Sequence, residues 1–500
     1  MKHDAESVLK NTAIMMGSQV VTWLSSLVLI MFLPKYLGSH NYGELYLAMS
    51  ITMLFQVLIE FGGQYHITKE VSRDRNNVPY IFADSSLLRI FLWIISMAIM
   101  LLFAEAAGYQ WPVPVLIIIL GVSKLWDGIN SLLRNCFQGF ELMEYPSAGS
   151  ISERVFLTVT AVAALLAGLG QVTIAVLMAF STLINFILSF YFSRKIIHFL
   201  PSFDFRRSLK LLKQGLPYFL WSVFATLYYR IDVIMLSVMT TYSVVGWYGA
   251  AYKLFDVLMF FPYIFSQSLF PVLSRIAETT QASLTKALQK SLNIILLVGL
   301  PISIILFSFP EQIINFLFGL KEYYQSIVLL KIFSIGLLLV YVDFILGTVV
   351  MATDKQKKWS VVAALAIFLN VGLNYLAIPF SQANFGNGGI GAAAATIITE
   401  LYIMISAIVL LRGTVKNPLD APFIGKVLIA GIAMCFTVYV TKIFSIDWYI
   451  QAFLSCSAYF SLLFLMKIFS ADEIRSVKSL PVVKNLVDIF LLKDKRGVNA

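Results

Sequence analysis

Four basic residues lie inside long apolar stretches of the sequence, where they could bind a charged ligand. Arg89, Lys124, Arg230 and Lys253 each fall in a run of apolar residues long enough to cross about 30 Å of hydrocarbon. A basic side chain that faced lipid there would cost about 2.5–3.5 kcal/mol. We therefore expect these four side chains to face protein or water, and we predict that they bind an anionic substrate.

Four acidic residues lie in similar stretches: Glu60, Asp232, Asp343 and Glu400. A buried carboxylate binds or releases a proton when its surroundings change. We predict that these acids couple transport to protons or Na⁺. No other cofactor is expected.

Two of the bases have an acid three residues further along: Lys124 has Asp127, and Lys253 has Asp256. Residues at this spacing share one face of a helix. Such pairs could neutralise each other and hold helices together, and this structural interpretation stays open beside the binding one. The two arginines have no such neighbour, which favours a water-filled cavity. A guanidinium group matches phosphate oxygens, so a diphosphate headgroup is one suitable ligand.

The elements that carry these charges are predicted to be transmembrane helices. Hydrophobic residues make up 59% of the 500 residues and charged residues 13%, and the mean hydropathy is +0.83. These values predict an all-α integral membrane protein with about fourteen helices and no soluble domain. The predicted helices cover residues 8–36, 41–71, 80–105, 112–140, 146–169, 172–198, 210–240, 243–275, 284–309, 324–351, 357–380, 388–413, 424–444 and 448–468.

The basic residues of the loops predict the orientation. Alternate loops and the C-terminal tail hold most of the Lys and Arg, while the opposite loops hold only Lys35, Lys321, Lys331 and Lys442. The positive-inside rule then places both termini in the cytoplasm. We expect a multi-pass protein of a prokaryotic inner or plasma membrane.

Short motifs recur in the two halves of the chain. Leu9-Lys10 precedes Tyr42-Gly43, and Leu212-Lys213 precedes Tyr248-Gly249 at similar spacing. This order suggests a duplicated unit of six helices, and two such bundles beside a cavity are typical of transporters. The predicted domains are an N-lobe over 1–200, a C-lobe over 201–415, a helix pair over 416–470 and a cytoplasmic basic tail over 471–500.

Other functions lack support in the sequence. The formal net charge is +10, but the basic residues are dispersed over loops, so anionic lipids are the expected partner and nucleic acid is not. The three cysteines lack the spacing of a metal site, and no metal site or catalytic residue is predicted. An enzyme would need a positioned base or nucleophile, and the histidines fall at loops or helix ends.

The order of several motifs resembles the oligosaccharide-lipid flippases of the MOP (multidrug/oligosaccharidyl-lipid/polysaccharide) superfamily, which export O-antigen and exopolysaccharide. The motifs are Lys10-Asn11, Leu37-Gly38, Tyr42-Gly43, Glu60-Phe61-Gly62, Arg230-Ile231-Asp232, Met235-Leu236, Gly246, Tyr248, Ala251 and Lys253. The resemblance covers nearly the whole chain. It implies two six-helix lobes in a V, as in MATE transporters, with a C-terminal helix pair at the side.

The resemblance also implies a substrate and partners. A lipid-diphosphate-linked oligosaccharide would move from the cytoplasmic to the outer leaflet by alternating access, and a polysaccharide polymerase and chain-length machinery would be partners. Arg230, Asp232 and Lys253 belong to the family pattern, while Arg89 and Lys124 are predicted from burial cost alone. Tyr228, Tyr229, Asn370 and Asn374 are candidates for glycan contacts.

Three alternatives remain: a flippase of lipid-linked peptidoglycan precursor, a multidrug extruder of the same superfamily, and a membrane enzyme of glycan assembly. Basic residues within the spans disfavour a cationic drug as cargo, because like charges repel strongly in a cavity of low dielectric.

Overall fold

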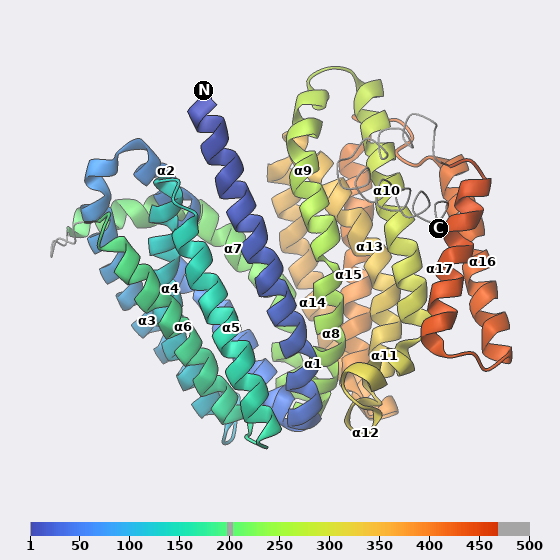
Figure 1. Ribbon diagram of the computed structural model, residues 1–500, viewed down its shortest axis with the longest axis horizontal. Helices are drawn as coiled ribbons and strands as arrows, with labels where there is room; N and C mark the ends of the chain where they lie inside the picture. Colours follow the sequence, from blue (N-terminus) through green and yellow to red (C-terminus); the bar gives the residue numbers. More distant parts are fainter. Residues whose placement is uncertain (1, 198–203, 469–500) are drawn as a thin grey trace, which may run out of the picture.

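The computed structural model describes residues 2–197 and 204–468 of the chain. The predicted basic tail over 471–500 lies outside the described residues. All major elements of the described part are helices (Figure 1). Their bounds are α1 Lys2–Glu60, α2 Gly63–Arg73, η1 Arg75–Asn77, α3 Val78–Ala106, α4 Val113–Gly139, α5 Glu144–Leu166, α6 Gln171–Ser193, α7 Phe205–Met239, α8 Tyr242–Leu258, α9 Phe260–Ala277, α10 Gln281–Ser308, α11 Pro310–Leu317, α12 Leu320–Tyr323, α13 Ser326–Ala352, α14 Gln356–Phe385, α15 Gly388–Leu411, α16 Ala421–Ile443 and α17 Trp448–Leu465.

The prediction of about fourteen membrane crossings is confirmed. Among the described residues, 13 helices are long and apolar enough to span a membrane. The first of these, Ile14–Glu60, has 47 residues, which at about 1.5 Å per residue is twice the thickness of the hydrocarbon layer. Its backbone leaves helical geometry at Gly38, where φ is 73° and ψ is 170°. Glycine tolerates this conformation, so α1 bends there and crosses twice.

The helices form two groups, which diverge toward the end of the molecule where the N-terminus lies, as Figure 1 shows. In the first group α1 packs on α4 and α5, and α6 packs on both of these helices. In the second group α13 packs on α10 and α15, and α14 packs on α15 and α7. The last two helices, α16 and α17, pack on each other and on α10 at the outer flank. We refer to the two groups as the N-lobe and the C-lobe.

Helix α7 begins on the N-lobe and ends within the C-lobe. At its start, Arg207 Nε lies 2.8 Å from Asp84 Oδ2 on α3, and the backbone N–H of Asp204 donates to Asp84 Oδ1 at 2.9 Å. The Asp84 side chain is 1% exposed, so this ion pair is buried on its acidic side. One helix therefore connects the two lobes mechanically.

The lobes meet most closely where α1 packs on α8. A Cβ on Gly43 would lie 1.8 Å from Tyr242 O, and a Cβ on Gly246 would lie 1.9 Å from Ser39 O. The two glycines thus make equivalent contacts, as expected of duplicated units related by a pseudo-two-fold axis. In the structure, Gly43 of the first unit is therefore equivalent to Gly246 of the second. The sequence motifs had instead matched Gly43 with Gly249, three residues further along.

Further contacts close the same end of the molecule, opposite the N-terminus. Tyr323 Oη donates to Pro34 O at 3.0 Å, and Ser39 Oγ donates to Glu322 Oε2 at 3.3 Å. The hydroxyls of Tyr109 and Ser237 share a hydrogen bond of 2.6 Å. Burial raises the pKa of Tyr109 to about 12, so this phenol stays neutral in the closed end. The lobes are therefore joined at this end.

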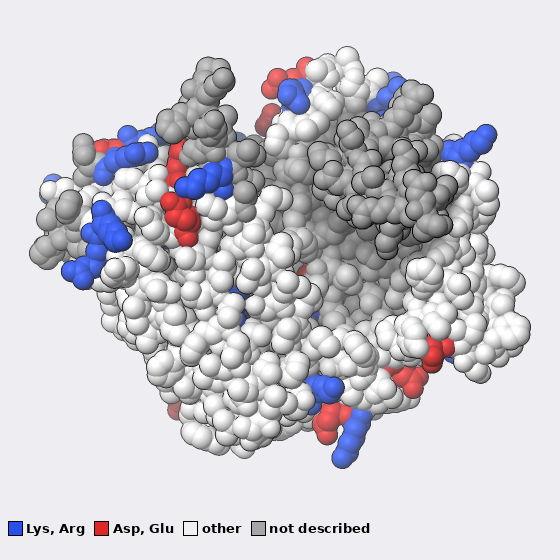
Figure 2. Space-filling view, viewed as in Figure 1, with Lys and Arg blue, Asp and Glu red and all other residues white. Residues whose placement is uncertain are grey.

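Charged side chains gather at the two ends of the molecule and leave an uncharged band between them (Figure 2). A band of this kind suits contact with lipid tails. The same view shows a hollow between the two lobes.

Candidate substrate cavity and buried charges

A cavity of about 630 Å³ lies between α1, α7 and the α8–α9 pair, and we call it the interlobe cavity. It is lined by Trp23, Ser26, Leu27, Ile30, Met53, Ala225, Thr226, Tyr229, Arg230, Asp256, Val257, Met259, Phe260, Tyr263 and Phe344. Most of this wall is apolar or aromatic, as is usual for a ligand pocket with a few charged groups. Arg230 and Asp256 are the charged residues of the wall.

Arg230 is held by partners from other helices. Its Nη1 donates to Tyr46 Oη on α1 at 3.3 Å, and its Nη2 lies 4.0 Å from Asp256 Oδ2 on α8. Lys253 Nζ lies 3.9 Å from the same Asp256 oxygen. The predicted Lys253–Asp256 pair is therefore present. Arg230 has no acidic partner on its own helix, as predicted, but tertiary packing brings Asp256 of α8 to it.

The charges at this wall do not balance. Arg230 and Lys253 share the single carboxylate of Asp256, and Arg154 of α5 lies near enough to Lys253 to repel its charge. Both ion pairs are long, close to 4 Å, and Arg230 Nε has no acceptor among the described residues. The guanidinium group at the cavity wall is thus loosely paired, which suits a charge-assisted contact with an anionic group.

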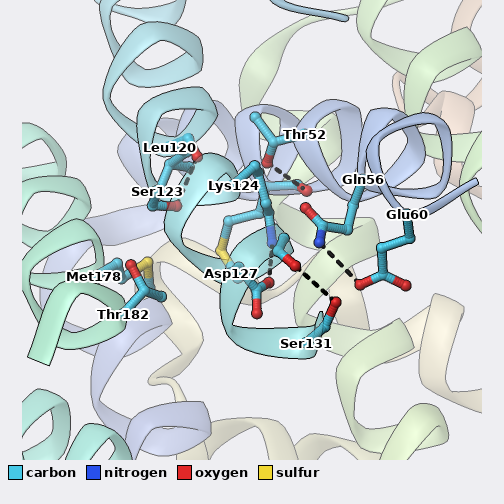
Figure 3. Close-up of polar contacts among 12 residues, drawn as sticks. Thr52, Gln56, Glu60, Leu120, Ser123, Lys124, Asp127, Ser131, Met178 and Thr182 are labelled. Carbon is cyan, nitrogen blue, oxygen red and sulfur yellow. Dashed lines mark hydrogen bonds and ion pairs between the residues drawn. The ribbon is translucent and has the colours of Figure 1, made fainter. Parts of the chain in front are cut away.

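The other two predicted bases lie inside the N-lobe, away from the interlobe cavity. Lys124 pairs with Asp127 at 3.4 Å on α4, opposite Gln56 and Glu60 of α1 (Figure 3). Gln56 Nε2 donates to Glu60 Oε1 at 3.0 Å. The structure therefore brings Lys124 and Glu60 into one N-lobe polar cluster that is separate from Arg230 and Lys253.

Arg89 lies deeper in the N-lobe and is 3% exposed. Its Nη1 donates to Ser131 Oγ at 2.7 Å and to Gly128 O, while Nη2 has no partner among the described residues. Arg89 and Glu60 line one small cavity of about 20 Å³, which is room for about one water molecule. This space is too small for a diphosphate headgroup.

Asp232 lies on the same helix as Arg230 but faces into the C-lobe. Its carboxylate accepts hydrogen bonds from Asn374 Nδ2 at 2.6 Å, Thr396 Oγ1 at 2.7 Å and Tyr248 Oη at 2.9 Å. Asn374 also donates to Asn370 Oδ1 at 2.9 Å. No basic side chain of the described chain forms an ion pair with Asp232, which is 4% exposed. The two asparagines predicted to contact glycan are buried in this cluster.

Asp343 and Glu400 lie side by side at the wall of a second cavity of about 470 Å³, which we call the C-lobe cavity. It is lined by Tyr228, Tyr229, Tyr263, Ser266, Gln267, Phe270, Val340, Asp343, Phe344, Gly347, Thr348, Met351, Trp359, Glu400 and Ile403. Tyr228 Oη donates to Glu400 Oε1 at 2.5 Å. Three residues, Tyr229, Tyr263 and Phe344, line both cavities, so the two spaces adjoin.

The sequence reasoning named Arg230 and Tyr229 but missed other residues of this wall. Thr226 lies four residues before Arg230 and three before Tyr229 on α7, so helical spacing alone could have added it to the same face. The aromatic residues Trp23 and Phe260 carried no such signal, because apolar aromatic residues are frequent throughout the chain.

The fold and the family are shown by comparison with known proteins. Residues 8–277 match the family described as "Polysaccharide biosynthesis protein", and residues 217–376 match the family MatE. Among curated proteins, no sequence matches the chain.

Solved structures with the same fold include a lipid II flippase, MurJ, in an inward closed conformation. It is 14% identical, with a TM-score of 0.73 over 92% of this chain and 98% of that one. An inward-facing multidrug resistance MATE family transporter of the MOP superfamily is 15% identical, with a TM-score of 0.65 over 79% of this chain and 95% of that one. A MOP superfamily transporter from Pyrococcus furiosus is 14% identical, with a TM-score of 0.54 over 82% of this chain and 94% of that one.

These matches agree with the two diverging lobes, the helix pair at the flank and the membrane-spanning composition. The chain is a multi-pass membrane protein with the fold of these transporters, and it belongs to the polysaccharide biosynthesis protein family.

Proposed function

We propose that this protein moves a lipid-diphosphate-linked oligosaccharide from the cytoplasmic to the outer leaflet of a prokaryotic cell membrane, for surface polysaccharide biosynthesis. The observation that carries the proposal is Arg230 at the wall of the interlobe cavity, with a guanidinium group only loosely paired to Asp256. A diphosphate offers the oxygens that such a fork binds best. The family and the solved relatives are flippases and transporters, which supports transport rather than catalysis.

The mechanism follows from the placement of polar and apolar groups. A lipid tail would stay in hydrocarbon beside the apolar residues of α1 and α9, while the diphosphate and the sugars cross inside the cavity. The protein would remove the cost of desolvating the polar groups in lipid. With the N-terminus in the cytoplasm, as the loop charges predict, the lobes are open inward and joined at the outer end.

A peptidoglycan precursor shares the lipid diphosphate and would bind the same arginine. A multidrug extruder is disfavoured at the interlobe cavity, because the one acid of its wall, Asp256, is already paired with Arg230 of the wall and with Lys253 beside it. The glycan therefore has to be identified by supplying different lipid-linked glycans to the purified protein.

The test of the proposed function is flipping by the full chain in proteoliposomes, measured as lipid-linked oligosaccharide that becomes accessible on the far leaflet. We expect Arg230→Ala to slow flipping about tenfold or more, which corresponds to about 1.4 kcal/mol. Arg230→Lys keeps the charge but loses the fork, so an intermediate rate is expected. Arg275→Ala, which removes an exposed arginine at the end of α9, is the matched control.

Two results would count against the proposal in different ways. If the wild-type protein moves no lipid-linked glycan above the rate of empty liposomes, the proposed function is wrong. If Arg230→Ala flips at the wild-type rate with normal folding, the function stands and the headgroup binds elsewhere.

We also propose that transport is coupled to a monovalent cation or proton at Asp232. A carboxylate buried without a basic partner is costly unless a cation or proton accompanies it. Asn374 Nδ2 and Thr396 Oγ1 donate hydrogen bonds to this carboxylate, and Asn374 Oδ1 has no hydrogen-bond partner among the described residues, which leaves one neutral oxygen for a bound cation. Coupling through Glu60, Asp343 or Glu400 and the partnership with polymerase and chain-length machinery stay predictions.

A further inference from the structure

A small cavity in the N-lobe is bordered by buried polar atoms that have no partner within the described chain. Arg89 and Ser85 of α3 line this cavity of about 20 Å³, together with Glu60 at the end of α1, and we call it the Arg89 cavity. Arg89 Nη2 and Ser85 Oγ have no hydrogen-bond partner among the described residues, and both residues are 3% exposed. A buried donor without an acceptor is costly, which indicates a ligand in this space.

The size and lining of the Arg89 cavity match one water molecule. A buried water needs roughly 10–15 Å³ of accessible space and two to four polar partners. The cavity has about 20 Å³, which is too little for two waters or for an organic group. Arg89 Nη2, Ser85 Oγ and the carboxylate of Glu60 are the polar groups of its wall, and the remaining lining residues are apolar. Three polar partners are therefore available to a single water.

The charges around the cavity favour a neutral ligand over an anion. Arg89 forms no ion pair within the described chain, and its Nη1 donates to two neutral acceptors, Ser131 Oγ at 2.7 Å and Gly128 O. Glu60 is the acid that attracts the Arg89 charge most strongly. An anion between these two side chains would be repelled by Glu60. A water molecule can instead accept from the guanidinium group and donate to the carboxylate.

We propose that one buried water joins Arg89 to Glu60, and that this water-bridged ion pair fixes the break between α1 and α2. The water oxygen accepts from Arg89 Nη2, and one of its O–H groups donates to the Glu60 carboxylate. The buried guanidinium charge is then compensated without a direct contact. Both residues are positioning residues in this arrangement, which is an alternative to the predicted role of Glu60 in ion coupling.

The break that the pair holds is packed against α7. Phe61 and Gly62, which follow Glu60 directly, have φ values of 44° and 65°. A Cβ on Gly62 would lie 2.4 Å from Gly215 O on α7, and a Cβ on Gly215 would lie 2.5 Å from Phe61 O. A residue other than glycine keeps a left-handed conformation only where its surroundings support it, and the anchored Glu60 supplies such support. Because α7 also carries Arg230, the break belongs to the frame that holds this arginine.

The ion pair is tested by a double-mutant cycle on the purified full chain, with the thermal midpoint in detergent as the readout. Arg89→Gln and Glu60→Gln each leave one charge of the pair uncompensated, and we expect each to lower the midpoint by about 3 °C or more. The double variant should lose clearly less than the sum of the two single losses. Arg134→Gln, which removes an exposed arginine of α4, is the matched control and should combine additively with Glu60→Gln.

The water itself is tested by Gly63→Ala. The new Cβ would lie 3.4 Å from Arg89 Nη2, in space that the water needs. We expect the coupling between Arg89 and Glu60 to be lost when the cycle is repeated in this background. Gly372→Ala on α14 is the control background, because nothing lies within 4 Å of a Cβ built there, and the coupling should persist in it.

A density map of the wild-type protein that resolves water molecules gives a test that needs no variant to fold. We expect one water within hydrogen-bond distance of both Arg89 Nη2 and the Glu60 carboxylate. An empty cavity, a direct contact between the two side chains, or an anion revealed by bromide substitution would overturn the proposal. Additive losses in the double-mutant cycle would overturn it as well.

The flipping assay separates the positioning role of Glu60 from ion coupling. Glu60→Gln should keep the wild-type response of flipping to proton and Na⁺ gradients, although the variant is less stable. Loss of that response would make Glu60 a coupling residue and would overturn its assignment as a positioning residue. The midpoints and the density map do not depend on the proposed function, so they decide the ion pair even if the protein moves no lipid-linked glycan.

Discussion

Three acidic side chains of the C-lobe, Asp232, Asp256 and Asp343, have different kinds of partner. Asp256 faces two basic side chains, Asp232 has three neutral hydrogen-bond donors, and Asp343 has no donor among the described residues. A charge-neutral partner lowers the cost of burial but leaves the net charge in place. Asp232 and Asp343 therefore lack the basic partner that Asp256 has.

The coupling proposal predicts the behaviour of Asp232→Asn. This change keeps the shape of the side chain but removes the charge that a proton or Na⁺ would neutralise. We expect flipping by the variant to become insensitive to imposed proton and Na⁺ gradients, while headgroup binding at Arg230 persists. Flipping measured with and without each gradient checks this. A variant that still responds to a gradient as the wild type does would exclude Asp232 as the coupling site.

At the scale of single elements, small residues allow α1 and α8 to pack with their backbones in close contact. Gly43 and Gly246 make equivalent approaches to the opposite helix, and Gly249 faces the ring of Tyr46. Small residues play this role widely in membrane helix pairs, where packing rather than the hydrophobic effect drives association. The α1–α8 contact also positions Tyr46 beside Arg230.

The close approach predicts that Gly43→Ala destabilises the protein. The new Cβ would lie 1.8 Å from Tyr242 O, so the helices must separate at a cost of about 1–3 kcal/mol. Gly372→Ala on α14 is the control, because nothing lies within 4 Å of a Cβ built there. The thermal midpoint in detergent should fall for the first variant and hold or rise for the second. Equal midpoints for the two variants would mean that α1 and α8 have room for a methyl group at Gly43.

On the scale of the whole molecule, the two lobes are joined at one end and diverge at the other. Hydrogen bonds from Tyr323 to Pro34 and from Ser39 to Glu322 cross between the lobes at the joined end. Alternating access would require these contacts to break when the cavity opens on that side.

A cross-link across the joined end should therefore stop transport. We expect cysteines at positions 39 and 322, joined through disulfides by a bis-methanethiosulfonate reagent, to abolish flipping in a variant whose native cysteines are replaced. Cleaving the reagent should restore the rate, and each single-cysteine variant should keep it. Undiminished flipping by the cross-linked protein would show that this end does not have to open.

The sequence by itself determined the membrane class, the helix spans, the pairs Lys124–Asp127 and Lys253–Asp256, and the family. Length, apolar composition and helical spacing are local properties that can be read along the chain. Only the tertiary structure decided that Arg230 pairs with Asp256 of α8, that Arg89 and Lys124 lie apart from it in the N-lobe, and that Asp343 meets Glu400. Those groupings depend on which helices pack together, and residues on different helices carry no local signal of their contact.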